Sequence, residues 1–310
     1  KPVEKQISKE WGTINMNLII SILEQGFIYG ILALGVYITY KILDFPDLTV
    51  DGSFPLGAAI SAAMLTRGLN PFLTLFISFA AGAAAGICTG LIHVKCKVRD
   101  LLSGIIMMTA LWTINLRIAG TSNVPLFSQK TIFSNELLNK IVPKGLLPYR
   151  TLLIIVIVAV IAKILLDLYM KTRSGYLLRA VGNNETLVTS LAKDAGNVKI
   201  LGLAIANGLV SMAGCIFCQE ERVFEISMGT GAIVIGLASV IIGTSLFKNI
   251  SLLQTTTTVL IGAVIYKACA ALAIRNFEPQ DMKLITAVLF LVILIISMDR
   301  KKRVKKHAGA

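Results

Sequence analysis

Long apolar runs alternate with short polar segments along this chain. Each run is long enough, or nearly so, to cross the ~30 Å hydrocarbon core of a bilayer as a helix, which takes about 20 residues. The pattern predicts about nine spans, at residues 17–40, 52–69, 71–94, 101–119, 150–170, 200–219, 230–247, 252–274 and 283–298. Because backbone groups in lipid must bond within the protein, the predicted fold is all-α, a polytopic transmembrane helix bundle.

Small residues recur on one face of the third predicted span. Gly82, Gly86 and Gly90 follow one another every four residues, which places them in a row along one side of a helix. Such rows let two helix backbones approach closely inside a membrane. We therefore expect this span to pack tightly against another helix.

Composition agrees with a membrane protein. The 310 residues are 55% hydrophobic and 15% charged, with a mean hydropathy of +0.77, whereas soluble domains carry about 25% charged residues. The net charge of +13 is densest in the tail 299–310, directly after an apolar run. Such a tail anchors a helix end at the anionic cytoplasmic surface of a lipid bilayer. It does not indicate a nucleic-acid partner.

The distribution of Lys and Arg predicts how the chain is oriented. With the basic tail inside and an odd number of spans, the segments predicted to lie inside carry more Lys and Arg than those outside. The chain then divides into an extracytoplasmic segment 1–16, a transmembrane domain 17–298 and a cytoplasmic tail 299–310. The longest polar connection on the inner side is 171–199.

Signatures of enzymes and metal sites are absent from the sequence. It contains no phosphate-binding loop of the G-x-x-x-x-G-K-[ST] type, no H-E-x-x-H and no G-x-S-x-G, and it has two histidines. Cys215 and Cys218 form a C-x-x-C inside an apolar run without a second pair or a histidine nearby, so we interpret them as buried packing residues. The chain is therefore not expected to be an enzyme, nor to bind a metal.

Polar side chains inside predicted spans are candidates to line a substrate path, because a charge in hydrocarbon is costly and usually functional. Lys267 lies deep in the eighth span and Glu24 about two turns into the first; Asn115 and Asn207 lie in the fourth and sixth. Alternatively, Glu24 lies near the outer headgroups and the Lys267 amine reaches to the interface.

The segment 41–55 carries many helix-interrupting residues. Pro46 and Pro55 each remove a backbone donor, and four residues that cap helices or turns stand close by, namely Asp47, Thr49, Asp51 and Ser53. The pattern fits a helix broken at membrane depth, with Asp47, Asp51 and Ser53 along the substrate path. It also fits a cytoplasmic loop with a capped helix start. In either case we expect one aspartate to act as a cap and at most one to meet substrate.

A polar helix of about ten residues is predicted within 171–199. The residues that define it are Gly182, Asn183, Asn184, Glu185, Leu187, Val188, Leu191 and Lys193. An asparagine can cap its start, the glutamate and the lysine suit its first and last turns, and Ala195-Gly196 would end it. Its apolar face could rest on the membrane or contact a cytoplasmic partner.

The residues of this region carry a family resemblance. RAVGNNETLVTSLAKDAGNVKILGLAIANGLVSMAGC is similar to the coupling-helix region of bacterial ABC importer permeases of the branched-chain amino acid and ribose permease family. EQGFIYGILALGVYITYKILDFPDLTVDGSFPLGAA resembles that family's first conserved block. Together with IAGTSNVPLF, these residues resemble most the subgroup associated with tryptophan or tyrosine uptake. The resemblance covers roughly 17–298.

The resemblance implies a fold, a function and a set of partners. The fold would be that of a type II-like ABC importer permease in the bacterial inner membrane. The solute would be a small molecule, an amino acid, and by the subgroup an aromatic one. A second permease copy would complete a homodimer. Two ABC ATPase subunits, which bind ATP and Mg, would dock on the coupling helices, while this chain would hold no cofactor of its own.

An extracytoplasmic substrate-binding lipoprotein is the last partner that the resemblance implies. Glu220, Glu221 and Glu225 fall outside in the predicted topology, as does the segment 120–149. We expect them to form part of the docking surface for that protein, where rim charges act mainly on the association rate.

Two other functions fit a polytopic bundle. An ion-coupled secondary transporter would show inverted repeats and buried ion-binding carboxylates, whereas no convincing repeat occurs and Glu24 is the clear intramembrane acid. A membrane scaffold without transport would leave the broken segment 41–55 and the polar helix without a role.

The orientation can be tested by labelling. We expect Lys5→Cys to react with a membrane-impermeant thiol reagent from outside the cell and Lys305→Cys to react only after permeabilisation, each in a background without the native cysteines. Modification of both positions from the same side would contradict the predicted topology.

Overall fold

The computed structural model describes residues 2–134, 149–184, 194–248 and 253–274, together with residues 188, 250, 284 and 286–295. Its helices and strands, in chain order, are α1 (Pro2–Val36), η1 (Tyr37–Ile42), α2 (Val50–Thr66), α3 (Pro71–Val94), α4 (Asp100–Ala119), β1 (Asn123–Pro125), η2 (Ile132–Ser134), α6 (Arg150–Met170), α7 (Arg173–Asn183), α9 (Ala195–Glu221), β2 (Val223–Glu225), η4 (Ile226–Gly229), α10 (Ala232–Leu246) and α11 (Thr255–Ile274).

The predicted helix bundle is confirmed, but the number of spans was too high. Within the described residues, seven helices are long and apolar enough to cross a membrane: Met16–Ile42, Pro71–Val94, Asp100–Ala119, Arg150–Met170, Ala195–Glu221, Ile226–Leu246 and Thr255–Ala273. The run predicted at 52–69 forms α2, a helix of 17 residues whose side chains are almost all buried. Because α2 lies inside the bundle, it has no need of the full length of a lipid-facing span. The run predicted at 283–298 is helical over 286–295.

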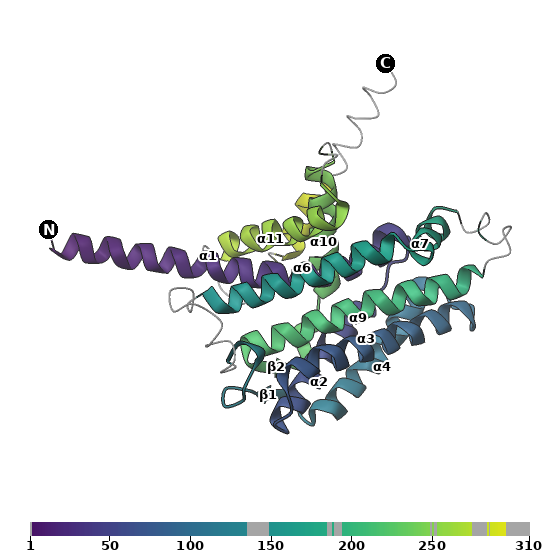
Figure 1. Ribbon diagram of the computed structural model, residues 1–310, viewed down its shortest axis with the longest axis horizontal. Helices are drawn as coiled ribbons and strands as arrows, with labels where there is room; N and C mark the ends of the chain where they lie inside the picture. The colour runs from purple at the N-terminus through teal and green to yellow at the C-terminus, as the bar shows by residue number, and fades with distance from the viewer. Residues whose placement is uncertain are drawn as a thin grey trace, which may run out of the picture.

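The helices form two groups that meet along α1 and α9 (Figure 1). In one group, α9 packs against α2 and α3, and α4 packs against α2. In the other, α1 packs against α6, α10 and α11, and α10 packs against α11. The main hydrophobic core lies between them, with Leu32, Phe54 and Val210 among its fully buried members. The contact of α1 with α9 is the most extensive one between the two groups.

Glycines make the contact between α3 and α9 very close. A Cβ atom at Gly82 would collide with the carbonyl oxygen of Asn207, and one at Gly86 with that of Leu203. The glycine row predicted in the third span therefore packs backbone against backbone, as small residues do in membrane helix pairs.

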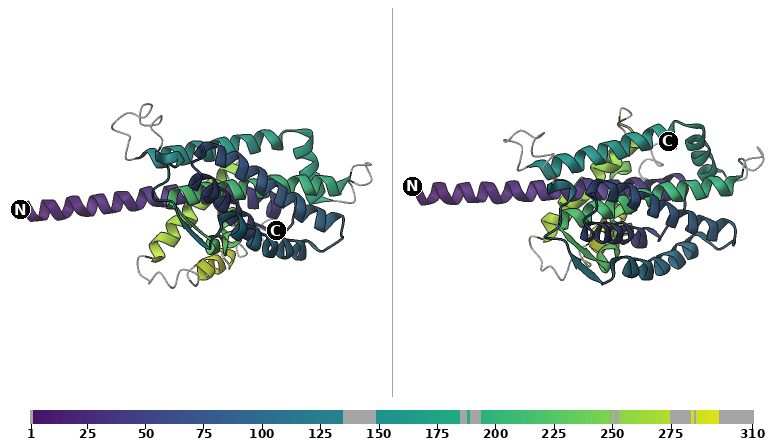
Figure 2. Two further views of the ribbon diagram at one scale, coloured as in Figure 1. Left: turned by 90° about the horizontal axis from the view of Figure 1, so that it is seen from below. Right: turned by 60° about the horizontal axis from the view of Figure 1, so that its bottom comes forward.

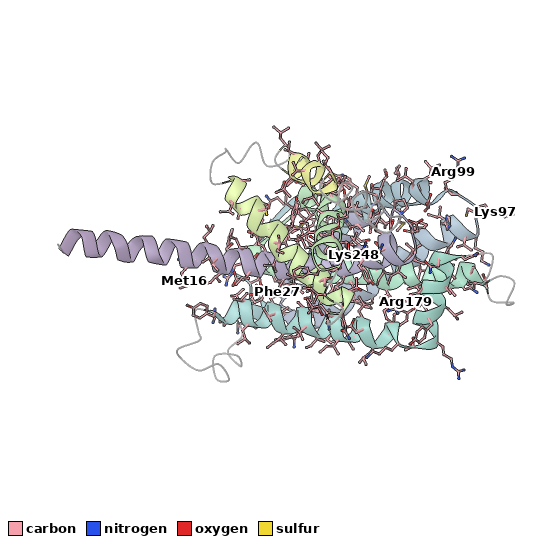
Figure 3. All side chains as sticks on the ribbon, turned by 90° about the horizontal axis from the view of Figure 1, so that it is seen from above. Met16, Phe27, Lys97, Arg99, Arg179 and Lys248 are labelled. Carbon is pink, nitrogen blue, oxygen red and sulfur yellow. The ribbon has the colours of Figure 1, made fainter. Side chains whose placement is uncertain are left out.

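The two ends of the bundle carry different features. At one end, β1 pairs antiparallel with β2, Asn123 opposite Glu225, and α1 continues beyond the bundle toward the N-terminus (Figures 1 and 2). At the other end lie Lys97, Arg99 and Arg179, far from Met16 (Figure 3). We call these the hairpin end and the basic end.

The close packing of α3 on α9 predicts a specific sensitivity. Gly82→Val should destabilise the protein by about 1–3 kcal/mol, because the new side chain meets the α9 backbone and cannot be accommodated without a shift. The measurement is the melting temperature of the purified protein in detergent. Ala84→Val, at an exposed position of the same helix, is the matched control and should melt like the wild type. Equal melting of both variants would show that α3 and α9 are not in this contact.

Candidate functional site

The helix break predicted near Asp47 is present between η1 and α2. The π-helical turn of η1 ends at Ile42, and the chain is not helical again until Val50. Within this segment Asp44 has a positive φ of 52°, and the Phe45 ring packs edge-on against His93, with 5.1 Å between ring centroids. Pro46 follows and has no backbone N–H, so this stretch has one donor fewer to satisfy.

Asp47 is buried and its carboxylate is fully engaged. The side chain is 1% exposed. Its Oδ1 accepts a hydrogen bond from the Thr49 backbone N–H at 2.9 Å, and its Oδ2 accepts one from the Asn207 side-chain amide at 2.7 Å. The Asn207 amide oxygen in turn accepts from the Ser53 hydroxyl at 2.8 Å. Burial raises the pKa of the Asp47 carboxyl, while the bonds from Thr49 and Asn207 oppose that rise.

Asp51 caps a helix that lies far away in the sequence. Its Oδ2 accepts a hydrogen bond from the backbone N–H of Gly231 at 3.0 Å, and its Oδ1 accepts one from that of Ile233 at 2.8 Å. These are orphan donors at the start of α10, where Gly231 has no side chain to act as a cap. The negative carboxylate also suits the positive end of the helix dipole.

Glu24 plays the same part for α6. Its half-buried carboxylate accepts a hydrogen bond from the backbone N–H of Leu152, in the first turn of α6. Asn115 supports α2 instead, because its side-chain amide donates to the Gly52 carbonyl at 3.0 Å. Of the residues predicted to line a path, Asp47, Asp51, Ser53, Glu24 and Asn115 thus each hydrogen-bond within the protein.

Lys267 lies among aromatic and acidic residues near the hairpin end. Its ammonium donates to the Gln25 side-chain oxygen at 3.2 Å and lies 3.9 Å from the centroid of the Tyr29 ring. The Gln25 amide donates to Glu221 at 3.1 Å. The lysine thus bridges α11 and α1, and Gln25 links it to the end of α9.

The predicted coupling region is described in part. Gly182 and Asn183 end α7, a helix over Arg173–Asn183 that the sequence did not predict, and Asn184 follows its last turn. Val188 is 1% exposed and packs with Val181 and Ala195. The other predicted coupling residues, Glu185, Leu187, Leu191 and Lys193, lie outside the described residues.

The expected end of the polar helix at Ala195-Gly196 is wrong. These residues begin α9, because Asp194 accepts hydrogen bonds from the backbone N–H groups of Gly196 at 2.9 Å and Asn197 at 3.3 Å. An Asp ahead of small residues is a start signal, and the Ala-Gly pair alone suggested a stop.

The three acids expected at the docking surface differ in exposure. Glu225 and Glu221 are exposed, Glu225 on β2 and Glu221 at the end of α9. Glu220 is partly buried, and its Oε2 has no hydrogen-bond partner.

Gln219, which the sequence analysis did not single out, hydrogen-bonds to the loop that contains Ile132. Its side-chain oxygen accepts from the Ile132 backbone N–H at 3.0 Å, and its amide donates to the Thr74 hydroxyl at 2.8 Å. The Thr74 hydroxyl also lies 3.2 Å from the Cys215 sulfur, within hydrogen-bond distance. The buried Cys215 therefore has a polar neighbour. Among the described residues no group of His, Cys, Asp or Glu could hold a metal ion.

Among the described residues, seven apolar helices, a buried segment whose helix is interrupted and a hydrogen-bonded loop at one end indicate a multi-pass membrane protein. Residues 18–298 match the family described as branched-chain amino acid transport system / permease component, and the chain belongs to that family. It is a permease component of an ABC transport system. The family gives no support to an ion-coupled secondary transporter.

Individual relatives agree with this assignment. The chain is 42% identical over 280 residues to the tyrosine transport system permease protein of Clostridioides difficile (strain R20291), covering 90% of this chain and 91% of that one. It is 24% identical over 297 residues to the ribose import permease protein of Escherichia coli (strain K12), covering 93% and 87%. The solved structure of PsaBC from Streptococcus pneumoniae in complex with Fab has a similar fold, with a TM-score of 0.50, 14% identity and coverage of 88% and 89%.

The capping of α10 by Asp51 can be tested by removing its two acceptor oxygens one at a time. Asp51→Ala should cost about 0.5–2 kcal/mol of stability, because two backbone donors at the start of α10 lose their acceptor. Asp51→Asn keeps one acceptor oxygen and should fall between it and the wild type. Melting temperatures in detergent measure the order, with the exposed Asp44→Asn as control. A wild-type melting temperature for Asp51→Ala would exclude the capping role.

Proposed function

We propose that this chain is the translocation subunit of a bacterial ABC importer that carries an amino acid, of the aromatic class, across the inner membrane. The observation that carries the proposal is the 42% identity, over nine-tenths of the chain, to a protein named for tyrosine transport. The substrate enters from the hairpin end and leaves at the basic end, driven by ATP hydrolysis in partner subunits.

The proposed partners fit the arrangement of the two ends. Two ATPase subunits, each with ATP and Mg, dock at the basic end, where α7 and Val188 form a small apolar cluster beside α9. A substrate-binding lipoprotein docks at the hairpin end on Glu221, Glu225 and the loop that Gln219 fastens. A second copy of this chain completes a homodimeric pore. The coupling residues on each copy are the predicted set from Gly182 to Lys193.

The loop at the hairpin end has the rigidity that a docking surface needs. The Leu126 backbone N–H donates to the Arg222 carbonyl at 2.8 Å, and the Ile226 N–H to the Ser122 carbonyl at 3.0 Å, on either side of the β1–β2 pair. Leu126 is fully buried beneath it, while the next residue, Phe127, is 69% exposed. An exposed aromatic on a fixed backbone is a typical anchor of a protein interface.

The substrate path in this proposal runs beside the break before α2. Asp47 and Asp51 shape that path through their hydrogen bonds with Asn207 and α10, and Ser53 continues the same polar row. Irregular backbone inside a membrane protein is tolerated where protein or a water-filled cavity surrounds it. Asn115, Glu24 and Lys267 are the further candidates along the path.

Reconstitution tests the function and the coupling region together. The wild-type permease with its ATPase and binding protein in liposomes should take up radiolabelled tyrosine when ATP is enclosed. Leu187→Pro should abolish both uptake and ATPase stimulation by the binding protein, since proline would break the coupling helix that the sequence predicts there. Leu187→Met, which keeps size and helix propensity, is the control.

Two outcomes would contradict the proposal in different ways. Absence of uptake of any aromatic amino acid by the wild-type system would refute the substrate class. Full stimulated ATPase activity in Leu187→Pro would refute the coupling role of this region.

A further inference from the structure

A lysine and a glutamate at the hairpin end lack an oppositely charged group at salt-bridge distance, although Glu220 and Glu221 lie near enough to Lys267 to interact with it electrostatically. In the described residues Lys163 and Asp167 form a salt bridge, whereas Lys267 forms none, and its ammonium rests on Gln25 and the Tyr29 ring. The Oε2 atom of Glu220 is buried without a hydrogen-bond partner. Leaving charged groups in such surroundings is costly, so they are usually retained for a function.

The Tyr29 ring beside this lysine belongs to a cluster of three aromatic rings. Tyr29 stacks on Phe54 with 5.7 Å between centroids, and Phe217 meets Tyr29 and Phe54 at 5.6 Å each. They come from α1, α2 and α9, so the cluster sits where the two helix groups meet. Tyr29 and Phe54 are buried, while Phe217 is partly exposed. The cluster thus offers one ring, Phe217, that a second aromatic group can reach.

These residues lie near the hairpin end of the bundle, the end at which the proposed function has the substrate enter. Glu220 stands one residue before the end of α9, and β2 follows directly at Val223. Lys267 reaches the same level through Gln25, whose amide contacts Glu221. Phe217 lies one helical turn deeper on α9 than Glu221. From the hairpin end inward, a solute would therefore meet the charges first and the rings next.

We propose that Lys267, Glu220 and the ring cluster of Tyr29, Phe54 and Phe217 form an entrance site that recognises a zwitterionic aromatic amino acid. The inference rests on the proposed function and adds to it the groups that select the substrate. The Lys267 ammonium pairs with the substrate carboxylate, and the Glu220 carboxylate with the substrate ammonium. Phe217 stacks on the substrate ring, at the 4.5–7 Å separation that aromatic pairs prefer.

Substrate would give both groups a better partner than the protein gives them by itself. A carboxylate gives Lys267 a charged partner in place of a neutral amide and a ring face, and charge-assisted hydrogen bonds are about twice as strong as neutral ones. The substrate ammonium gives the buried Glu220 oxygen a donor. A ligand with only one of the two charges gives a charged partner to one group and not to the other, and this is the source of selectivity.

The test measures binding to the permease without its binding protein. The purified permease–ATPase complex in lipid nanodiscs is titrated with radiolabelled tyrosine, and the competitors are tyramine, which lacks the carboxylate, and 3-(4-hydroxyphenyl)propionate, which lacks the ammonium. For the wild type we expect saturable binding of tyrosine, with each competitor weaker by about tenfold or more.

Each variant has its own expected pattern. Lys267→Gln should lower tyrosine affinity about tenfold and remove the preference over tyramine, and Lys267→Arg should restore both. Glu220→Gln should remove the preference over the propionate. Phe217→Leu should weaken all three ligands by a similar factor. Controls are Arg67→Gln, an exposed charge on the turn after α2, and Phe76→Leu, a ring 73% exposed on α3.

The inference is overturned if the wild type binds no tyrosine in this assay, or if Lys267→Gln and Glu220→Gln keep the wild-type preferences. Uptake by the complete importer separates this failure from that of the proposed function. Tyrosine uptake with no binding at the entrance leaves the function standing and removes the site. Absence of uptake of every aromatic amino acid removes the function itself.

Discussion

The hydrogen bonds from Asp51 to the start of α10 hold the two helix groups in register. Asp51 belongs to α2 in one group, and its carboxylate binds backbone N–H groups of Gly231 and Ile233 in the other. In the interior of a membrane bundle no water is present to accept hydrogen bonds from those donors, so a protein group has to accept them. Gly229 makes the joint tight, because any side chain there would collide with the Asp51 carbonyl and the Pro55 ring. Helix α10 can therefore begin where it does only while α2 is in place.

The same requirement explains why so many polar residues in this apolar chain have a partner distant in sequence. Glu24 serves α6, Asn115 serves the α2 backbone, and Asn207 joins Asp47 to Ser53. Each bond crosses between helices and fixes their relative position, which hydrophobic packing alone does weakly among lipid tails. In this membrane bundle, hydrogen bonds between polar side chains and distant backbone groups thus help to fix how the helices pack. In a soluble core, apolar burial does more of this.

Local patterns in the sequence predicted the helices and the break, and failed where the partner lies far along the chain. Apolar runs gave most spans to within a few residues, because a membrane helix must be long and apolar whatever its neighbours are. The prolines and capping residues around Asp47 marked the interruption before α2. That Asp51 caps α10 could not be foreseen, since 180 residues separate Asp51 from Gly231 and only the tertiary fold brings them together. Arg173–Asn183 was missed as a helix because its charged and apolar residues look like a loop between spans.

The contact between α7 and the broken segment joins the ATPase side of the proposed importer to the path. A Cβ atom at Gly182 would collide with the Ile42 carbonyl, and one at Gly202 on α9 would lie against Leu178 of α7 and Leu43. Ile42, the last residue of η1, therefore contacts α7 directly, and α7 leads into the predicted coupling region. If the proposed coupling is correct, a movement of α7 would act directly on the backbone at 42–43, because closely packed helices transmit displacement through contacts of this kind. From there the non-helical stretch leads within a few residues to Asp47, and through Asp51 to α10.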